Sequence, residues 1–207
     1  MNKIRTLVAA ALIAGISLMI LPSTTASAAL GLSVSENVWN RCRTQPITWT
    51  MYTEGTNLSL SKERKLIESA FQQVTAASGG AYTFVFVTAD KTRLRDAART
   101  GTQAPADALV SIASDKYLSL PLGDDLGRFL VNSETAAGET ELSFTSAFFS
   151  YNPRVLSSYT TQQRTAIYTS GALALIGVTR YEYTTALTNA EKKAVKSQAT
   201  RSCSRSA

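Results

Sequence analysis

The chain has 207 residues, a formal net charge of +6 and 44% hydrophobic residues, and it contains no histidine. This length fits one domain with a hydrophobic core. The missing histidine excludes sites that depend on imidazole, such as a histidine-ligated hydrolytic zinc or a Ser-His-Asp triad. Basic and aromatic residues do not cluster together, so the sequence gives no sign of a nucleic-acid interface.

The N-terminus has the pattern of a secretory signal peptide. Lys3 and Arg5 precede an apolar run over residues 7–21, and residues 26–28 read Ala-Ser-Ala. A basic start, a short apolar stretch and an A-x-A cleavage site define such signals. The apolar run is also short for a membrane span. We therefore predict a signal peptide at 1–28 and a single secreted, extracellular domain at 29–207, with no transmembrane segment after cleavage.

The chain contains two cysteines, Cys42 and Cys203. In an oxidising compartment an isolated pair is most simply a disulfide, which here would join the two ends of the domain. The alternative, two thiols that bind metal, would need carboxylates to complete the ligand set.

The first half of the domain predicts alternating strands and helices. Ile47–Tyr52 alternates apolar and polar residues, which indicates a strand. Ser61 is a candidate N-cap for a helix that ends before Gly79. Tyr82–Val87 is apolar on both faces, so we expect a central strand that runs parallel to the first. Ala108–Ala113 has the pattern of a third strand.

The stretch after Ser114 has weak periodicity and several carboxylates: Asp124, Asp125, Glu134, Glu139 and Glu141. Oxygen ligands of this kind suit calcium. Carboxylates without a defined spacing more often form a solvent-exposed acidic loop. We expect no bound metal, with calcium around Asp124 and Asp125 as the alternative.

The second half predicts an edge strand and two helices. Glu141–Phe149 alternates and is expected to be an antiparallel edge strand. Thr160 and Gln163 form a capping box that opens a nearly apolar helix ending at Gly177. A second capping box, Thr188 with Glu191, opens a last helix that runs to about Ala199.

The order of these elements resembles a known family. Trp39, Cys42, Arg43 and Pro46 precede the first strand, and helix, strand, strand, irregular loop, edge strand and helix follow. This arrangement resembles the matrixin-type metzincin peptidases of secreted actinobacterial proteins. The resemblance implies an α/β, zincin-like fold: a mixed, mostly parallel twisted sheet with an antiparallel edge strand, packed against two long helices, plus a C-terminal helix.

The family's zinc motif, HExxHxxGxxH, is degenerate in this chain. Laid without gaps on residues 170–180, the motif retains only its glycine, Gly177. The three ligand positions and the general-base position hold Ser170, Ala174, Arg180 and Gly171. The methionine turn of the family is missing too, because Met51 is the last methionine in the chain. The resemblance therefore implies a domain that has lost zinc and catalysis.

Arg180 allows two interpretations. Its guanidinium stays protonated and would oppose a divalent metal at the third ligand position. It either occupies the vacant metal position with its own charge or points to solvent beyond the helix end. Nearby, Tyr181 and Tyr183 alternate with Glu182, which favours a packed strand or turn over a sugar-binding platform.

Basic residues gather after Leu187, where Glu191 is the one carboxylate: Lys192, Lys193, Lys196, Arg201 and Arg205. This segment could contact an anionic cell envelope. The simpler interpretation is a solvated helix face with cations near its C-terminal end.

These observations predict a secreted pseudoprotease domain, monomeric and without catalytic residues or cofactor, that binds an extended peptide or protein. Strand addition would use the predicted edge strand, with Glu141, Ser143, Thr145 and Phe149 as its candidate residues. The alternatives are a hydrolase with an unrecognised site that does not use zinc and a structural protein of the cell envelope.

Overall fold

The computed structural model describes residues 31–43, 45–53, 56–88, 108–114, 126–135 and 142–205. The predicted signal peptide lies outside the described residues, as do Asp124, Asp125, Glu139 and Glu141. Within the described ranges, no helix combines the length and apolar character needed to cross a membrane.

The described part of the chain is a mixed α/β structure. Its strands are β1 (Leu32–Val34), β2 (Val38–Trp39), β3 (Ile47–Met51), β4 (Phe84–Phe86), β5 (Val110–Ser114), β6 (Gly127–Thr135), β7 (Leu142–Tyr151) and β8 (Val178–Arg180). Its helices are α1 (Leu60–Ala77), α4 (Pro153–Ser158), α5 (Thr161–Leu175) and α6 (Asn189–Arg205).

The main sheet is mostly parallel. β3 pairs in parallel with β4 and with β5, and β7 pairs in parallel with β5 and with β2. β6 pairs antiparallel with β7 along the full length of β7. A mostly parallel sheet with one antiparallel edge strand is thus confirmed. β1 and β8 form a separate antiparallel pair.

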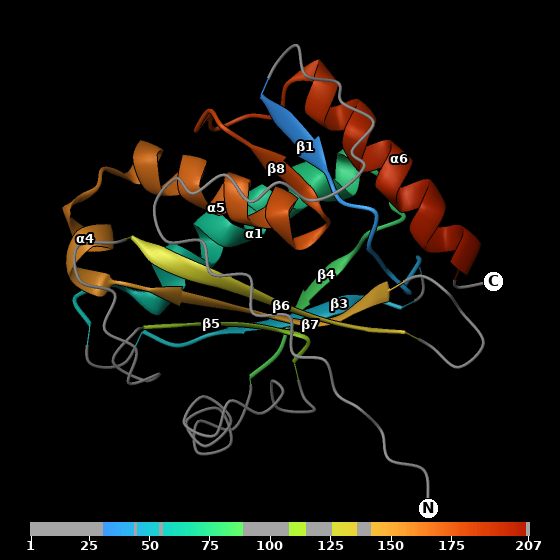
Figure 1. The fold of residues 1–207 in the computed structure, drawn as a ribbon. Helices are drawn as coiled ribbons and strands as arrows, with labels where there is room; N and C mark the ends of the chain where they lie inside the picture. Colours follow the sequence, from blue (N-terminus) through green and yellow to red (C-terminus); the bar gives the residue numbers. More distant parts are fainter. Residues whose placement is uncertain are drawn as a thin grey trace, which may run out of the picture.

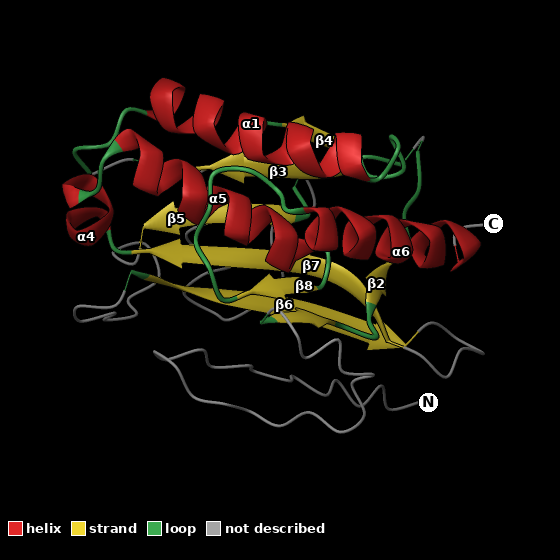
Figure 2. Cartoon of the chain, turned by 90° about the horizontal axis from the view of Figure 1, so that it is seen from above, coloured by secondary structure: helices red, strands yellow, loops and turns green. Residues whose placement is uncertain are grey.

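Helices cover one face of this sheet (Figures 1 and 2). α1 and α5 lie side by side on it, and α6 packs against α1, β2 and β8. The core lies between the helices and the sheet. Trp49 of β3 is central to it, with its ring edge-on to Phe71 of α1 and to Phe86 of β4. Burial of such large aromatic side chains supplies much of the driving force for packing helices on a sheet.

Two strand positions differ from the sequence prediction. β7, which contains Ser143, Thr145 and Phe149, is an interior strand and not an edge, because β6 borders one side of it and β2 and β5 border the other. β4 was expected to be central, yet β3 is its one partner among the described strands. Val85 of β4 is 45% exposed, so the apolar pattern of this strand does not reflect burial on both faces.

The two ends of the described chain are joined covalently. Cys42 and Cys203 form a disulfide with a sequence separation of 161, which confirms the predicted pair. α6 reaches Arg205, beyond the predicted end near Ala199. Its buried Ser202 hydroxyl donates to the carbonyl of Arg41 over 2.7 Å. The C-terminal end of α6 is therefore fixed to the segment that contains Cys42.

Candidate functional site

Residues 170–180, onto which the zinc motif is laid, begin on α5, whose ends match the sequence prediction. Thr160 caps the helix, and the Thr160–Gln163 capping box is present. The indole of Trp39 donates to the carbonyl of Leu175 over 2.6 Å, which satisfies one of the last carbonyls of the helix.

Gly177 turns the chain out of α5 and into β8. Its φ is +76°, the left-handed region that favours glycine. A Cβ at this position would lie 2.9 Å from both Gln198 Nε2 and Ser35 Cβ. The retained glycine of the motif therefore has a structural cause, a left-handed turn against α6.

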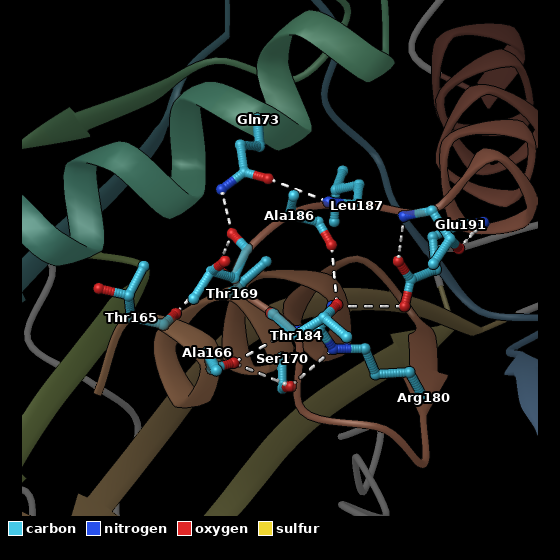
Figure 3. Close-up of polar contacts among 12 residues, drawn as sticks. Gln73, Thr165, Ala166, Thr169, Ser170, Arg180, Thr184, Ala186, Leu187 and Glu191 are labelled. Carbon is cyan, nitrogen blue, oxygen red and sulfur yellow. Dashed lines mark hydrogen bonds and ion pairs between the residues drawn. The ribbon is translucent and has the colours of Figure 1, made fainter. Parts of the chain in front are cut away.

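Arg180 does not point to solvent. It lies on β8, paired with Leu32 of β1, and its side chain is 3% exposed. Its guanidinium is directed back onto α5, where Nε donates to Ser170 Oγ over 2.8 Å and Nη2 donates to the Ala166 carbonyl over 3.1 Å (Figure 3). Residues at the first and third ligand positions of the family motif are thus hydrogen-bonded to each other.

The other donors of Arg180 bind the loop after β8 and the start of α6. Nη1 donates to Thr184 Oγ1 over 2.8 Å and lies 3.4 Å from Glu191 Oε1, and Nη2 also donates to the Thr184 carbonyl. The Glu191 side chain is 6% exposed. A buried charge is stable only when it is paired and hydrogen-bonded. Arg180 and Glu191 meet that requirement together.

Glu191 has a second role as part of the predicted capping box of α6. The Thr188 N–H donates to Glu191 Oε2 over 2.7 Å, and the Glu191 N–H donates to Thr188 Oγ1 over 3.2 Å. One carboxylate therefore both caps α6 and balances the charge of Arg180.

The loop of residues 181–188 is also held from α1 and α5. Gln73 Nε2 donates to the Thr185 carbonyl over 2.9 Å, and the Leu187 N–H donates to Gln73 Oε1 over 3.1 Å. The hydroxyl of Thr169, a buried residue of α5, lies 3.4 Å from the same Thr185 carbonyl. Figure 3 shows these contacts converging on the loop from three helices.

These residues do not fit a zinc ion. Ser170 Oγ is already bound to a guanidinium, Ala174 offers no ligand atom, and the cation of Arg180 would repel a divalent metal. Gly171, at the general-base position of the motif, has no side chain and lines a small apolar cavity between α5, α1 and the sheet. Among the described residues, no three histidine, cysteine or carboxylate side chains are close enough to hold a metal ion.

A second buried polar cluster lies toward the N-terminal end of α5. The Tyr168 hydroxyl donates to Glu63 Oε2 of α1 over 2.6 Å, and Arg164 Nε lies 3.3 Å from Glu63 Oε1. Burial, and then the charge of Glu63, raises the pKa of Tyr168. Sequence reasoning missed this cluster. The signal was available, because Glu63 shares the apolar face of α1 with Ile67 and Phe71.

Of the predicted peptide-binding residues, the three that the structure describes, Ser143, Thr145 and Phe149, lie on the interior strand β7. Ser143 is 6% exposed and sits on β7 opposite Val38 of β2. Thr145 and Phe149 are partly buried on the same strand. The prediction that this segment offers an edge for strand addition is therefore wrong. β6, which contains Glu134 in an exposed position, is the antiparallel strand at this edge of the sheet.

Comparison of the chain with protein-family models, with curated proteins and with solved structures finds no match.

Proposed function

We propose that the chain is a secreted, non-catalytic, zincin-like domain of the matrixin type that binds an extended polypeptide by strand addition at β6. The contact between Arg180 and Ser170 is the observation that carries the non-catalytic part of the proposal. The guanidinium binds the side chain at the first ligand position that the resemblance implies, and its charge is balanced by Glu191. The disulfide agrees with an oxidising, extracellular compartment.

The strand order and the helix positions support the zincin-like part of the proposal. α1 and α5 are the two long helices on the sheet, α6 is the C-terminal helix, and the degenerate motif begins on the second long helix. β6 is the antiparallel edge strand. The two long helices and the antiparallel edge strand agree with the fold that the resemblance implies. The edge strand is β6 and not the predicted 141–149 segment, and β7 and α4 lie between it and the second long helix in the sequence.

The backbone N–H and C=O of Val131 in β6 point outward from the sheet, as the pairing of β7 shows. The Ala147 N–H donates to the Leu109 carbonyl over 2.8 Å, so the backbone of Ala147 faces β5. Val131 lies directly opposite Ala147 in the antiparallel ladder. In an antiparallel ladder, the backbone N–H and C=O groups of two opposite residues either both point toward the partner strand or both point away from it. The N–H and C=O of Val131 therefore face away from β7, the direction from which an added strand would approach.

A selection of random extended peptides on the purified chain tests the proposal. Selected peptides should bind the wild type and lose about tenfold or more in affinity for Val131→Pro, because proline removes the outward N–H. Val131→Ala is the matched control, since it shortens the partly buried side chain and keeps the N–H. Hydrogen exchange should show protection at Val131 when the peptide is bound.

Three results would contradict the proposal. The first is a selection that yields no binder, and the second is a set of binders that Val131→Pro leaves unaffected. The third is about one tightly held zinc per chain by elemental analysis, together with casein hydrolysis that a chelator blocks. Activity on peptide, ester or glycoside substrates that survives the Ser170→Ala and Arg180→Ala double variant would instead support a hydrolase with another site.

A structural role at an anionic cell envelope is the second candidate. Lys192, Lys193 and Lys196 are all exposed on α6, whereas Arg201 is bound to the Ser35 carbonyl. Exposed cations of this kind bind anionic surfaces weakly and lose that binding in salt. Retention on anionic vesicles that is released by high salt and by a Lys192, Lys193 and Lys196 to glutamine triple variant would favour this role.

A further inference from the structure

The loop after β8 carries two exposed aromatic residues two positions apart in the sequence. Tyr181 is 65% exposed and Tyr183 is 67% exposed, whereas Val85 and Leu60, the other exposed large hydrophobic residues described, reach 45% and 40%. The expectation that these tyrosines pack within a strand or turn is therefore wrong. Isolated exposed hydrophobic residues are ordinary, but two aromatic side chains within three residues form a local surface suited to a partner.

The loop that carries these tyrosines is held by hydrogen bonds from Arg180 and from Gln73 of α1. Arg180 immediately precedes them and uses its donors on Ser170, Thr184 and Glu191. Gln73 binds the backbone on both sides of Ala186. Because the loop is already ordered, a partner that contacts it loses little conformational entropy on this side of the interface.

Gly31 supports the ring of Tyr181. Gly31 has φ +63°, and a Cβ there would lie 2.9 Å from Tyr181 Cδ2. The ring therefore rests against backbone on one side, while most of its remaining surface is open. A side chain at residue 31 would have to displace the ring, so glycine at this position allows Tyr181 to lie against the backbone.

The exposed residue between the two tyrosines is a carboxylate without a partner of its own. Glu182 makes no hydrogen bond or ion pair within the described ranges, because the nearest cation in sequence, Arg180, is paired with Glu191. Aromatic faces attract cations, and a carboxylate beside them adds a charge-assisted hydrogen bond. A guanidinium suits both contacts because it is planar and stacks on aromatic rings.

We propose that Tyr181, Glu182 and Tyr183 form a docking surface for an arginine side chain of a partner protein. Each tyrosine ring supplies a stacking face and Glu182 supplies the countercharge. This proposal does not depend on strand addition at β6.

Binding of a defined peptide to the full chain tests the proposal. The probe is an end-blocked decapeptide of alternating serine and arginine, compared with its citrulline counterpart and with chitotetraose, by calorimetry at physiological ionic strength. The net charge of +6 disfavours non-specific attraction of a cationic peptide. We expect the arginine peptide to bind. The affinity for the citrulline peptide should be lower by a factor of about five or more.

Variants separate the surface from general effects on folding. Tyr181→Ala, Tyr183→Ala and Glu182→Gln should each weaken the arginine peptide about threefold to tenfold. Tyr181→Phe should retain binding because it keeps the ring, and Leu60→Ala on α1 serves as a distant exposed control. Circular dichroism and the unfolding midpoint establish that each variant is folded.

The proposal is overturned if the arginine peptide does not bind, if citrulline binds equally well, or if the three variants bind like wild type. Binding of chitotetraose in place of the peptide would show a glycan platform instead. Loss of peptide binding in Val131→Pro with no effect of Tyr181→Ala would assign the contact to β6. This result would therefore overturn the tyrosine surface and leave the proposal for β6 intact.

Discussion

Each of the two polar clusters along α5 pairs an arginine with a buried glutamate, but the two arginines differ in their hydrogen bonds and in their exposure. Toward the C-terminal end, Arg180 has hydrogen-bond acceptors on α5, on the loop after β8 and on α6, and its side chain is 3% exposed. Toward the N-terminal end, Arg164 faces Glu63 over 3.3 Å, its Nε has no hydrogen bond of good geometry, and its side chain is 16% exposed. The first cluster fixes three elements in one arrangement, whereas the second leaves its arginine partial access to water.

This difference predicts a large loss of stability when Arg180 is replaced. Arg180→Met leaves Glu191 buried without its cation, and removal of one partner of a buried pair costs about 3–5 kcal/mol. Urea unfolding measures the change. The Arg180→Met and Glu191→Gln double variant should recover part of it, because glutamine keeps an acceptor for the cap without the charge. A double variant no more stable than Arg180→Met would show that the charge pairing is not what fixes this cluster.

The disulfide holds the other end of α6 and should act independently. The Cys42→Ser and Cys203→Ser double variant should lose about 2–4 kcal/mol. Distant sites add, so its effect should sum with that of Arg180→Met. Thiol titration of unfolded, unreduced wild-type protein should detect no reactive thiol, and two thiols per chain would refute the bond.

Replacement of Glu63 should cost less than replacement of Arg180. Glu63→Gln keeps an acceptor for the Tyr168 hydroxyl and removes the charge that faces Arg164, which can turn further toward water. We expect a loss of about 1–2 kcal/mol in urea unfolding. A loss as large as that of Arg180→Met would remove the distinction between the two clusters.

Two buried tyrosines predict how stability changes at alkaline pH: Tyr168 of the second cluster, and Tyr82, which belongs to neither cluster. Burial raises the pKa of Tyr82 to about 12, and burial together with Glu63 raises that of Tyr168. Unfolded tyrosines ionise near pH 10, so above that pH the folded state holds more protons than the unfolded state. The free energy of unfolding should be maintained below about pH 10 and fall as the pH rises above it. Tyr168→Phe should make this fall shallower, and an unchanged slope would contradict the assignment.

Gly171, which directly follows Ser170 on α5, should be replaceable by alanine with a small gain in stability. It lies within α5, and a Cβ there would meet nothing within 4 Å. Gly171→Ala should raise the free energy of unfolding by about 1 kcal/mol, since alanine favours helix. Gly177→Ala is the contrasting control and should destabilise, because its φ is +76° and its Cβ would touch Ser35. Destabilisation by Gly171→Ala would show that the cavity cannot accept a methyl group.

The features that sequence predicts correctly here depend on near neighbours or on covalent chemistry. The capping boxes at Thr160 and Thr188 are confirmed, as is the disulfide of Cys42, because few alternatives compete with them. The positions of the strands within the sheet were harder to predict from the sequence. β7 alternates like an edge strand, and its interior place comes from long-range pairing with β2 and β5 that no local pattern encodes.

The candidate site was predictable in its residues but not in its contacts. The absence of histidine ligands for zinc follows from the sequence alone. The direction of Arg180 does not, because it depends on β8 pairing with β1 and on α6 bringing Glu191 to the same place. The antiparallel strand β6 was missed because polar residues such as Glu134 interrupt its pattern, and its pairing with β7 is set by tertiary structure.

The bond between Cys42 and Cys203 also determines how the domain responds to mechanical load. Along the covalent chain, a tensile force applied from outside residues 42–203 passes through the sulfur bridge. The segment between the two cysteines is then loaded only through its noncovalent contacts, such as the pairing of β1 with β8 and of β2 with β7. β1 and β2 precede Cys42, so a pull on the N-terminal side would detach them first. Loss of β1 would remove the partner of β8, the strand that carries Arg180. Tension on that side would therefore reach the candidate site before it disturbs the main body of the sheet.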